Sequence, residues 1–351
     1  PGFTEGIIYQ NRNTFRDYSA IFMQRSKDIL WKDVNIYFMH GMGFVSQFCD
    51  NITFDSLSVK TKEGTGRTCA AWADILHFSG CKGKIEVLNS YLSAANDDAI
   101  NVHGTHLRII DAISNKKVKV RFMHPQTYGF DAFVVGDSVE FIRAKSLLPF
   151  SKNVIFKIKK LNEKEIELVF EKNIPNNIEA NDVIENISWT ADVTIRNNKI
   201  AHIPTRGILI TTRGKVIIDN NEFFKTHMSG ILIADDANNW FESGYVKDIT
   251  ISNNKFIDCG APVINIHPEN SKIVADKPVH RNIQIINNEF ILDKQIIFSA
   301  KSTGNIKFSN NIIDSDKNLN MYDLIRMEAC LNIEMKYNQL NNKMVNNVYK
   351  K

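Results

Sequence analysis

Two adjacent carboxylates, Asp97 and Asp98, stand directly before a short apolar run in the stretch "AANDDAINVHG" (94–104). The earlier stretch "ADILHFSG" (73–80) has the same apolar pattern and the same closing glycine, which aligns Asp74 with Asp98. If these stretches are neighbouring strands, Asp74 and Asp98 lie about 4.8 Å apart at the backbone. Asp97 is then expected to point elsewhere or to occupy the preceding corner.

Carboxylates gathered on one surface repel each other, so the pKa of at least one is expected to be raised. A neutral carboxylic acid beside ionised carboxylates is suited to glycoside hydrolysis. The acid protonates the leaving oxygen, while a carboxylate activates water or attacks the sugar directly. Activation of water on the opposite face of the sugar requires a separation of about 6.5–9.5 Å.

Two other interpretations of these aspartates stay open. For Asp97 or Asp98 taken alone, a solvated aspartate at a strand end is the better explanation, but the pair together with Asp74 favours a site. A calcium site is the second alternative, although the spacing of a DxDxDG loop is missing.

A second acidic pair, Asp235 and Asp236, follows its strand, and a solvated turn is the better interpretation of it. The same loop contains Trp240 and Glu242, and an exposed tryptophan commonly packs on the apolar face of a galactose ring. Five further residues flank the same strand ends, each of them more often structural than catalytic when taken singly: Trp72, His77, His103, Arg206 and His227.

A repeated unit predicts the architecture that positions these residues. "VTIRNNKI" alternates apolar and polar residues before an Asn-Asn pair, and similar or degenerate units begin at Ile7, Ile29, Ile52, Ile85, Val216, Ile249, Ile283, Ile306 and Ile333. Second short strands follow at Gly207, Gly230, Pro262 and Gln295. Alternation indicates strands, and paired asparagines tolerate the left-handed conformation of sharp corners.

Such units cannot bury their apolar faces alone and must stack on one another. The repeat therefore predicts an all-β fold, a right-handed parallel β-helix, in which the asparagines form a hydrogen-bonded ladder from coil to coil. A leucine-rich repeat is the competing solenoid, but its LxxLxL pattern is missing.

One segment interrupts the repeat. Between Thr105 and about Trp189 the chain has strand-like runs separated by turn residues, which predict a small antiparallel β-barrel or sandwich. We therefore expect β-helix coils with the acidic site at 1–104, an inserted domain at 105–189 and further coils at 190–351. Because the insertion begins beside the paired aspartates, we expect it to form a wall of the site rather than a surface decoration.

Composition excludes several classes of function. The net charge is +4 with scattered Lys and Arg residues, which does not suggest nucleic-acid binding, and no apolar run is long enough to span a membrane. Five cysteines without a CxxC pair argue against structural zinc and a disulfide framework and suggest buried thiols. The first residues show no signal peptide and look like the middle of a fold, so we expect a fragment or a processed form.

The stretches "AWADILHFSGCKGKIEVLNSYLSAANDDAINVHGT" (71–105), "RGILITTRGKVIIDNNEF" (206–223) and "GILIADDANNWFESGYVKDI" (230–249), with the insertion between them, resemble glycoside hydrolase family 110. Members of that family are inverting exo-α-1,3-galactosidases, and some of their substrates carry the blood group B structure. The resemblance implies that the catalytic residues are Asp74, Asp97 and Asp98. By analogy with other inverting β-helix hydrolases, Asp97 would be the general acid, and Asp74 with Asp98 would hold and deprotonate the water.

The resemblance also implies an oligosaccharide substrate with a terminal α-galactose, export to the periplasm or the cell exterior, and chemistry without a metal or another cofactor. The flank of a solenoid invites homodimer contacts. Members of the family start with a secretion signal and further coils, and we expect both to be missing from this sequence. We expect four residues to contact the substrate: His103, Arg206, Trp240 and Glu242.

Three other functions are compatible with a β-helix that carries acidic residues. A polygalacturonase would need Asn-Thr-Asp, Gly-His-Gly and Arg-Ile-Lys motifs, but Asp74 follows Trp-Ala and the segment after the pair reads "INVHG". A polysaccharide lyase would need a basic cluster with calcium beside the acidic pair. A non-catalytic carbohydrate-binding β-helix would bind galactosides even after Asp97→Asn or Asp98→Asn, which we expect to be exposed positions of little cost to stability.

Overall fold

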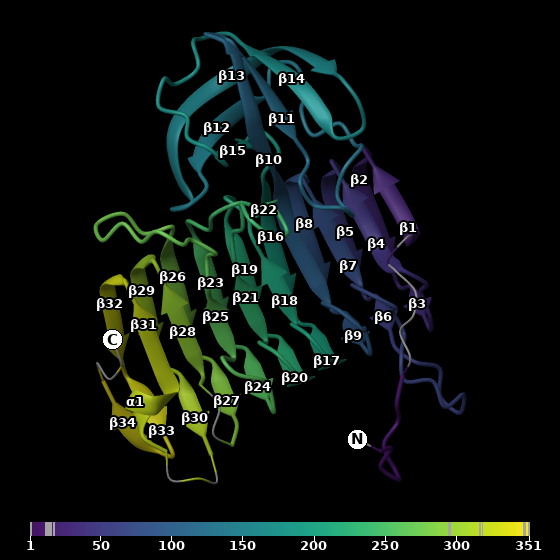
Figure 1. The fold of residues 1–351 in the computed structure, drawn as a ribbon. Helices are drawn as coiled ribbons and strands as arrows, with labels where there is room; N and C mark the ends of the chain where they lie inside the picture. Colours follow the sequence, from purple (N-terminus) through teal and green to yellow (C-terminus); the bar gives the residue numbers. More distant parts are fainter. Residues whose placement is uncertain are drawn as a thin grey trace.

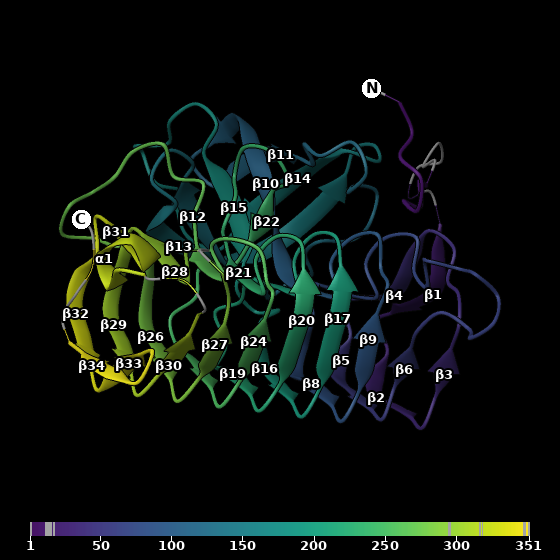
Figure 2. The same cartoon turned by 90° about the horizontal axis from the view of Figure 1, so that it is seen from below.

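The computed structural model describes residues 2–10, 16, 18–293, 296–315, 317, 319–346 and 349. Over these residues the chain winds into stacked coils, whose strands form three long sheets running from one end of the molecule to the other. A small barrel rises above the middle of the stack (Figure 1). Viewed from below, successive coils turn at aligned corners (Figure 2). The prediction of a parallel β-helix with an inserted barrel is confirmed.

Each coil contributes strands to three sheets, which are parallel except at the marked strands. The first sheet contains β1 (Ser19–Gln24), β4 (Met42–Gln47), β7 (Leu76–Ser79), β10 (Ile100–Ser114), β18 (Ile208–Ile210), β21 (Ile231–Ile233), β25 (Ile264–Ile266), β28 (Phe298–Lys301) and β31 (Ile325–Glu328), with β22 (Glu242–Ser243) antiparallel on β10. The second contains β2 (Lys27–Lys32), β5 (Asp50–Asp55), β8 (Lys82–Leu88), β16 (Ala191–Arg196), β19 (Val216–Asp219), β23 (Ile249–Ser252), β26 (His280–Ile286), β29 (Thr303–Ser309) and β32 (Leu331–Lys336). The third contains β3 (Asn35–Ile36), β6 (Ser58–Val59), β9 (Tyr91–Ser93), β17 (Lys199–Ile203), β20 (Glu222–Thr226), β24 (Lys255–Ile257), β27 (Glu289–Ile291), β30 (Ile312–Asp314) and β33 (Asn338–Leu340), with β34 (Lys343–Val345) antiparallel at its end. A one-turn helix, α1 (Met321–Leu324), precedes β31.

The register of the second sheet follows the sequence repeat. Val193 pairs with Val216, and each later unit pairs through its own first residue with the unit before it, up to Ile333. Ile29 pairs with Ile52, and Ile52 with Ile85, in the same way. Ile7 lies outside any strand, so the unit predicted there is wrong. Gln295, where a second strand was expected to start, lies outside the described residues.

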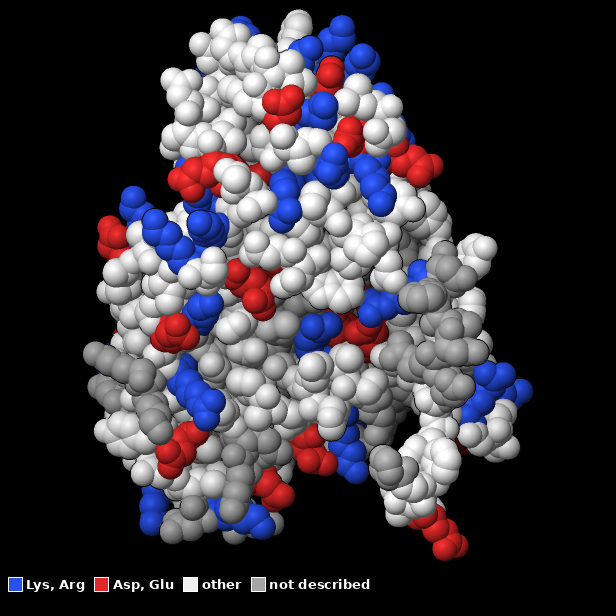
Figure 3. Space-filling model, viewed as in Figure 1, with Lys and Arg blue, Asp and Glu red and all other residues white. Residues whose placement is uncertain are grey.

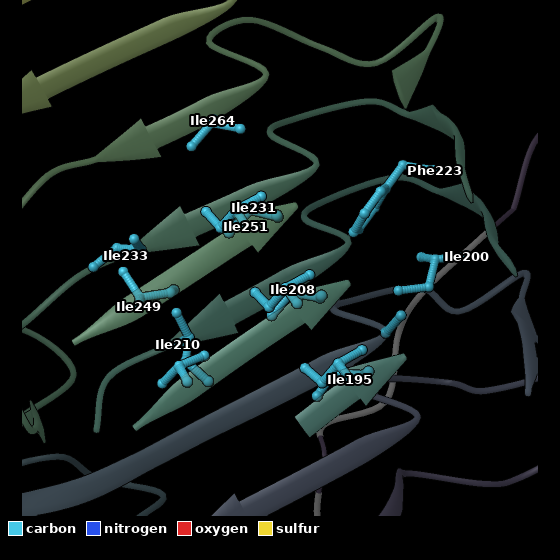
Figure 4. Close-up of a cluster of buried hydrophobic side chains, with 14 of the residues drawn as sticks. Ile195, Ile200, Ile208, Ile210, Phe223, Ile231, Ile233, Ile249, Ile251 and Ile264 are labelled. Carbon is cyan, nitrogen blue, oxygen red and sulfur yellow. The ribbon is translucent and has the colours of Figure 1, made fainter. Parts of the chain in front are cut away.

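Apolar side chains from all three sheets fill the interior of the coils. Figure 4 shows isoleucines of β18, β21 and β25 facing isoleucines of β16 and β23. At one corner, Phe223, Phe256 and Phe290 stack on consecutive coils with ring centroids 4.7 and 5.0 Å apart. A side chain repeated at one coil position thus lies in contact with its own equivalents, which gives a continuous core.

The two asparagines of each Asn-Asn pair have different structural roles. The first asparagine of each pair takes a positive φ at the corner, for example 53° at Asn220 and 55° at Asn253. The second points inward and is buried, as at Asn221 and Asn254. The amide of Asn254 accepts from the backbone and side chain of Asn221 and donates to the side chain of Asn288. The predicted asparagine ladder is confirmed over six coils: Asn198, Asn221, Asn254, Asn288, Asn311 and Asn338.

The inserted barrel is a closed ring of strands. It contains β11 (Lys117–Arg121), β12 (Ser138–Arg143), β13 (Leu148–Lys160), β14 (Glu165–Phe170) and β15 (Val183–Asn186), and β10 closes it by pairing with both β11 and β15. The sequence pattern indicated the first four of these strands but missed β15. Strand β10 is continuous across Gly104, so the chain passes from solenoid to barrel within one strand.

Two further findings bear on the sequence-based expectations. Four of the five cysteines are buried and Cys330 is half-buried, and all are free thiols, as predicted. Among the residues described, no helix is long and apolar enough to cross a membrane.

We predict that Asn254→Ala lowers the free energy of unfolding by about 3 kcal/mol, because it removes four ladder hydrogen bonds and leaves buried partners unsatisfied. Urea titrations followed by circular dichroism measure this loss. Asn253→Gly is the matched control, since glycine keeps the left-handed corner, and it should cost less than about 1 kcal/mol. Equal losses for the two variants would show that the ladder does not hold the coils together.

Candidate active site

A cavity of about 620 Å³ lies between the first sheet and the barrel. Strands β1, β4, β7, β10 and β18 or the turns before them form its floor, and the barrel segment 124–130 with Glu163 forms a wall, as expected for the insertion. On the face seen in Figure 3, acidic atoms flanked by basic ones lie beneath the barrel. All seven residues expected at a site line the cavity: Asp74, Asp97, Asp98, His103, Arg206, Trp240 and Glu242.

Three charged residues occupy one coil position on consecutive coils. Strand β7 pairs with β10, and β10 with β18, in a register that places Asp74, Asp98 and Arg206 side by side, each two residues before its strand. The next residue in the row is Met42, and the amide of its neighbour Gly43 donates to the carbonyl oxygen of Asp74 over 2.9 Å. A Cβ atom at Gly43 would lie only 2.3 Å from a carbonyl oxygen of the neighbouring turn, so this close approach requires glycine.

The three aspartates form a compact and buried group. One oxygen from each of Asp74, Asp97 and Asp98 lies within 4.8 Å of the others. Their exposed fractions are only 2%, 6% and 1%. Of the two alternatives for Asp97, the first is wrong, because its carboxylate does not point away from the group; the residue lies in the bend before β10, as the second alternative had it. The expectation that Asp97 and Asp98 are exposed positions is wrong. The pairing of Asp74 with Asp98 across adjacent coils is confirmed by the register.

Cationic groups compensate these carboxylates. Oδ1 of Asp98 accepts from the Thr205 hydroxyl at 2.9 Å, from the Arg206 backbone at 3.2 Å and from Arg206 Nε at 2.7 Å. Arg206 Nη2 lies 3.7 Å from Asp97 Oδ1, and Arg16 also forms an ion pair with Asp97. Arg206, expected to contact substrate, is thus the main partner of the acidic pair.

The surroundings push two of the pKa values apart. Burial raises the pKa of Asp98 to about 7, and the charges of Asp74 and Asp97 add to this rise against the attraction of Arg206. Burial alone would also raise the pKa of Asp74, but the hydrogen bond and charge of His77 lower it, helped by the arginines. A carboxyl that keeps its proton near neutral pH therefore lies one coil away from a carboxylate that does not.

A hydrogen-bonded row of polar side chains continues from Asp74. Its Oδ2 lies 2.8 Å from His77 Nδ1, and His77 Nε2 lies 3.0 Å from His103 Nε2. The other nitrogen of His103 contacts the carbonyl oxygen of Gly104 at 2.6 Å. Glu242 Oε1 lies 3.7 Å from His103 Nε2 and accepts from the Asn101 amide at 3.2 Å. Glu242 reaches this place because β22 pairs with β10.

Trp240 stands at the rim of the cavity with 48% of its surface exposed. Its ring stacks on His124 of the barrel, with centroids 4.6 Å apart and an interplanar angle of 28°. The Arg16 guanidinium lies 5.6 Å from the Trp240 centroid. The tryptophan therefore connects the loop after β21 to the barrel wall as well as facing the cavity.

The loop that carries Trp240 is built on the second acidic pair. Asp235 is buried and lies 3.0 Å from His106 Nε2, while Asp236 accepts from the backbone amides of residues 238–240, including Trp240 at 2.6 Å. Both aspartates are at most 5% exposed. The interpretation of this pair as a solvated turn is wrong, because it holds the loop against the barrel and β10.

Two residues named from the sequence are not brought to the site. Among the described residues that line the cavity, Trp72 and His227 do not occur; the first is half-buried and the second exposed. His77, Asn101 and His124 line the cavity but were not among the seven expected residues. A polar Asn101 between buried Ile100 and Val102 is a signal in the sequence, since alternation puts it on the outer face.

Three clustered carboxylates are also a kind of group that can hold a divalent cation. Here each carboxylate already has a cationic partner, since Arg206 and Arg16 contact the acidic pair and His77 contacts Asp74.

Comparisons with known proteins agree with this architecture. Residues 117–184 match the family model described as GLAA-B beta-barrel domain II, and residues 182–349 match that of a right handed beta helix region. The second match supports the predicted handedness.

Three curated relatives are named alpha-1,3-galactosidase A. The relative from Akkermansia muciniphila is 49% identical over 316 residues, which cover 90% of this chain and 53% of the relative. Those from Bacteroides thetaiotaomicron and Bacteroides fragilis are 42% and 43% identical, covering 95% and 86% of this chain and 59% and 51% of the relatives. The chain thus spans about half the length of the curated relatives it matches. Over that span, as the resemblance to glycoside hydrolase family 110 indicated, it belongs to the family of these alpha-1,3-galactosidases.

Proposed function

We propose that this chain carries the active site of a glycoside hydrolase that releases terminal α-1,3-linked galactose. The observation that carries the proposal is the group of Asp74, Asp97 and Asp98 at the floor of a cavity, with the pKa raised at Asp98 and lowered at Asp74. Such a group can supply a proton donor and a base within reach of one sugar ring. The names of the relatives support galactose as that sugar.

Roles follow from the environment of each carboxyl. Asp74 is ionised and is the base that takes a proton from the attacking water. Asp98 keeps a proton near neutral pH, because burial raises its pKa to about 7, and it can pass this proton to the neighbouring Asp97 carboxyl, which has an oxygen within 4.8 Å. Asp97 gives this proton to the leaving oxygen, since Oδ1 of Asp98 is already held by Thr205 and Arg206. Asp98 thus acts with Asp97 rather than as a second base.

Inversion of configuration is part of the proposal and rests on the resemblance. The separation between the nearest carboxylate oxygens counts against it, since 4.8 Å is below the usual 6.5–9.5 Å. A water held between two carboxylates would support inversion, because two oxygens up to about 5 Å apart can both hydrogen-bond one water at about 2.8 Å each. Asp74 also has its carboxylate engaged by a cationic partner, which makes it a weak nucleophile toward the sugar.

The proposed substrates are oligosaccharides such as blood group B-type glycans. Their removal from the cell's surroundings would require export, which the resemblance also implies.

The first prediction concerns stereochemistry and substrate. The protein should release β-galactose first, both from a linear α-1,3-galactosyl oligosaccharide and from its fucosylated B-type counterpart. The anomeric proton signals in NMR measure which anomer forms first. Early α-galactose would mean that an aspartate attacks the sugar, as the short separation alone suggests. No release from folded protein, with galactoside binding retained, would favour a non-catalytic carbohydrate-binding β-helix.

The second prediction separates donor from base. Asp97→Asn should lower kcat on the oligosaccharide by about 10³-fold or more, but should hydrolyse α-galactosyl fluoride well, because fluoride leaves without a proton. Asp74→Asn should lose both activities. Both variants should keep the fold, since asparagine has the same shape as aspartate and can still hydrogen-bond, and circular dichroism checks this. Preserved fluoride hydrolysis in Asp98→Asn instead of Asp97→Asn would move the donor role to Asp98.

The third prediction concerns pH. The proposed donor pair must be protonated, so kcat/KM should be high below the pKa of about 7 at Asp98 and should fall as pH rises through it. The pKa of the base Asp74 is lowered, so Asp74 should stay ionised down to a pH below the ordinary pKa of an aspartate, and kcat/KM should fall only below that pH. A profile of kcat/KM between pH 3 and 9 measures both limbs. A rate that rises through pH 7 would instead make ionised Asp98 a base.

A further inference from the structure

The row of hydrogen bonds from Asp74 through His77 to His103 allows its protons to be placed. His103 Nδ1 lies 2.6 Å from the carbonyl oxygen of Gly104, which can only accept. Nδ1 of His103 therefore carries a hydrogen. The pKa of His103 is lowered, chiefly by burial, so the ring is neutral near pH 7 and its Nε2 has a free lone pair.

His77 must then be the donor in the contact between the two rings. Its Nε2 lies 3.0 Å from Nε2 of His103, and one proton has to lie between these nitrogens. Since His103 accepts, the hydrogen is on His77 Nε2. The remaining nitrogen of His77 faces Asp74 Oδ2 at 2.8 Å, and this contact needs a proton as well.

That last proton belongs to the pair of Asp74 and His77 together. If Asp74 is ionised, His77 carries hydrogens on both nitrogens and is an imidazolium; if His77 is neutral, Asp74 is a carboxylic acid. The charges around the pair decide between these states. His77 faces Asp74, Glu242, His103 and Arg16, and the two carboxylates outweigh the burial and the arginine, so the pKa of His77 is raised. The pair is therefore an ion pair.

We propose that His77 and His103 are positioning residues that keep Asp74 ionised. His77 contributes the positive charge, and His103 fixes which nitrogens of His77 carry hydrogen. The negative charge of Glu242 helps to keep His77 protonated, and its Oε1 lies 3.7 Å from His103 Nε2. The inference rests on the proposed function only in giving Asp74 the role of base; the placement of the protons rests on the contacts of the two histidines and on the charges around them.

The placement of protons is tested first, without activity. In protein labelled with ¹⁵N at histidine, NMR at pH 7 should show His77 with both nitrogens protonated and His103 as the neutral Nδ1–H form. His77→Gln and His103→Gln assign the signals. A neutral His77 at pH 7, or His103 protonated at Nε2, would overturn the inference whether or not the protein cleaves galactosides.

The effect on Asp74 is tested by the pH profile. Without the cation, the pKa of the buried Asp74 should rise, so His77→Gln should move the acidic limb of kcat/KM upward by at least one pH unit and lower the plateau. His103→Gln should move the limb in the same direction by less. The matched control is His106→Gln, which removes a histidine from another buried aspartate, Asp235, away from the cavity.

The outcomes separate a positioning role from a structural one. His106→Gln should lower thermal stability and leave the acidic limb in place. A fall in kcat for His77→Gln with an unmoved acidic limb would show a structural role only and would overturn the inference. Wild-type protein that releases no galactose would contradict the proposed function, and the NMR result would then still decide the proton placement.

Discussion

The register of the parallel strand pairing is the constraint on which the rest of this molecule depends. Because each coil stacks directly on the one before it, a residue at a given coil position has its equivalents as its nearest neighbours. Whatever interaction a side chain makes with a copy of itself is then repeated along the stack. For isoleucine and phenylalanine this interaction is packing, and for a buried asparagine it is a pair of hydrogen bonds.

The same stacking is unfavourable for aspartate, because carboxylates at one coil position repel each other. This repulsion occurs at the candidate site. Asp74 and Asp98 share a coil position and repel each other, but the next coil offers Arg206 at that position instead of a third carboxylate. The row thus ends in its own counter-ion. His77 and the Thr205 hydroxyl complete the compensation from the sides. Local instability is confined to two coils and is offset by the regular coils on both sides.

The sequence predicted those parts of the structure that depend on patterns repeated over a short stretch of chain. Alternation and Asn-Asn corners predicted the coils, and a shared closing glycine predicted the pairing of Asp74 with Asp98. What it could not supply were contacts between segments far apart in the chain. The burial of Asp235 depends on His106 from β10, the barrel closes only through β15 and its pairing with β10, and Asp97 lies in a group that includes Arg206. The unit predicted at Ile7 failed because a pattern alone does not place a neighbour for it to pair with.

The continuity of β10 has a mechanical consequence. Strand β10 carries Asn101 and His103 on the cavity floor and continues without a break as one strand of the barrel that forms the wall. A hinge needs a few residues that can absorb a change in backbone angles, but this strand is paired along its length: with β7 and β18 before Gly104, with β22 at Gly104 and Thr105, and with β15 and β11 beyond them. Barrel and solenoid therefore move as one rigid body along this connection. Any widening of the cavity to admit a branched ligand has to come from its rim, where the loop bearing Trp240 meets His124 through ring stacking alone.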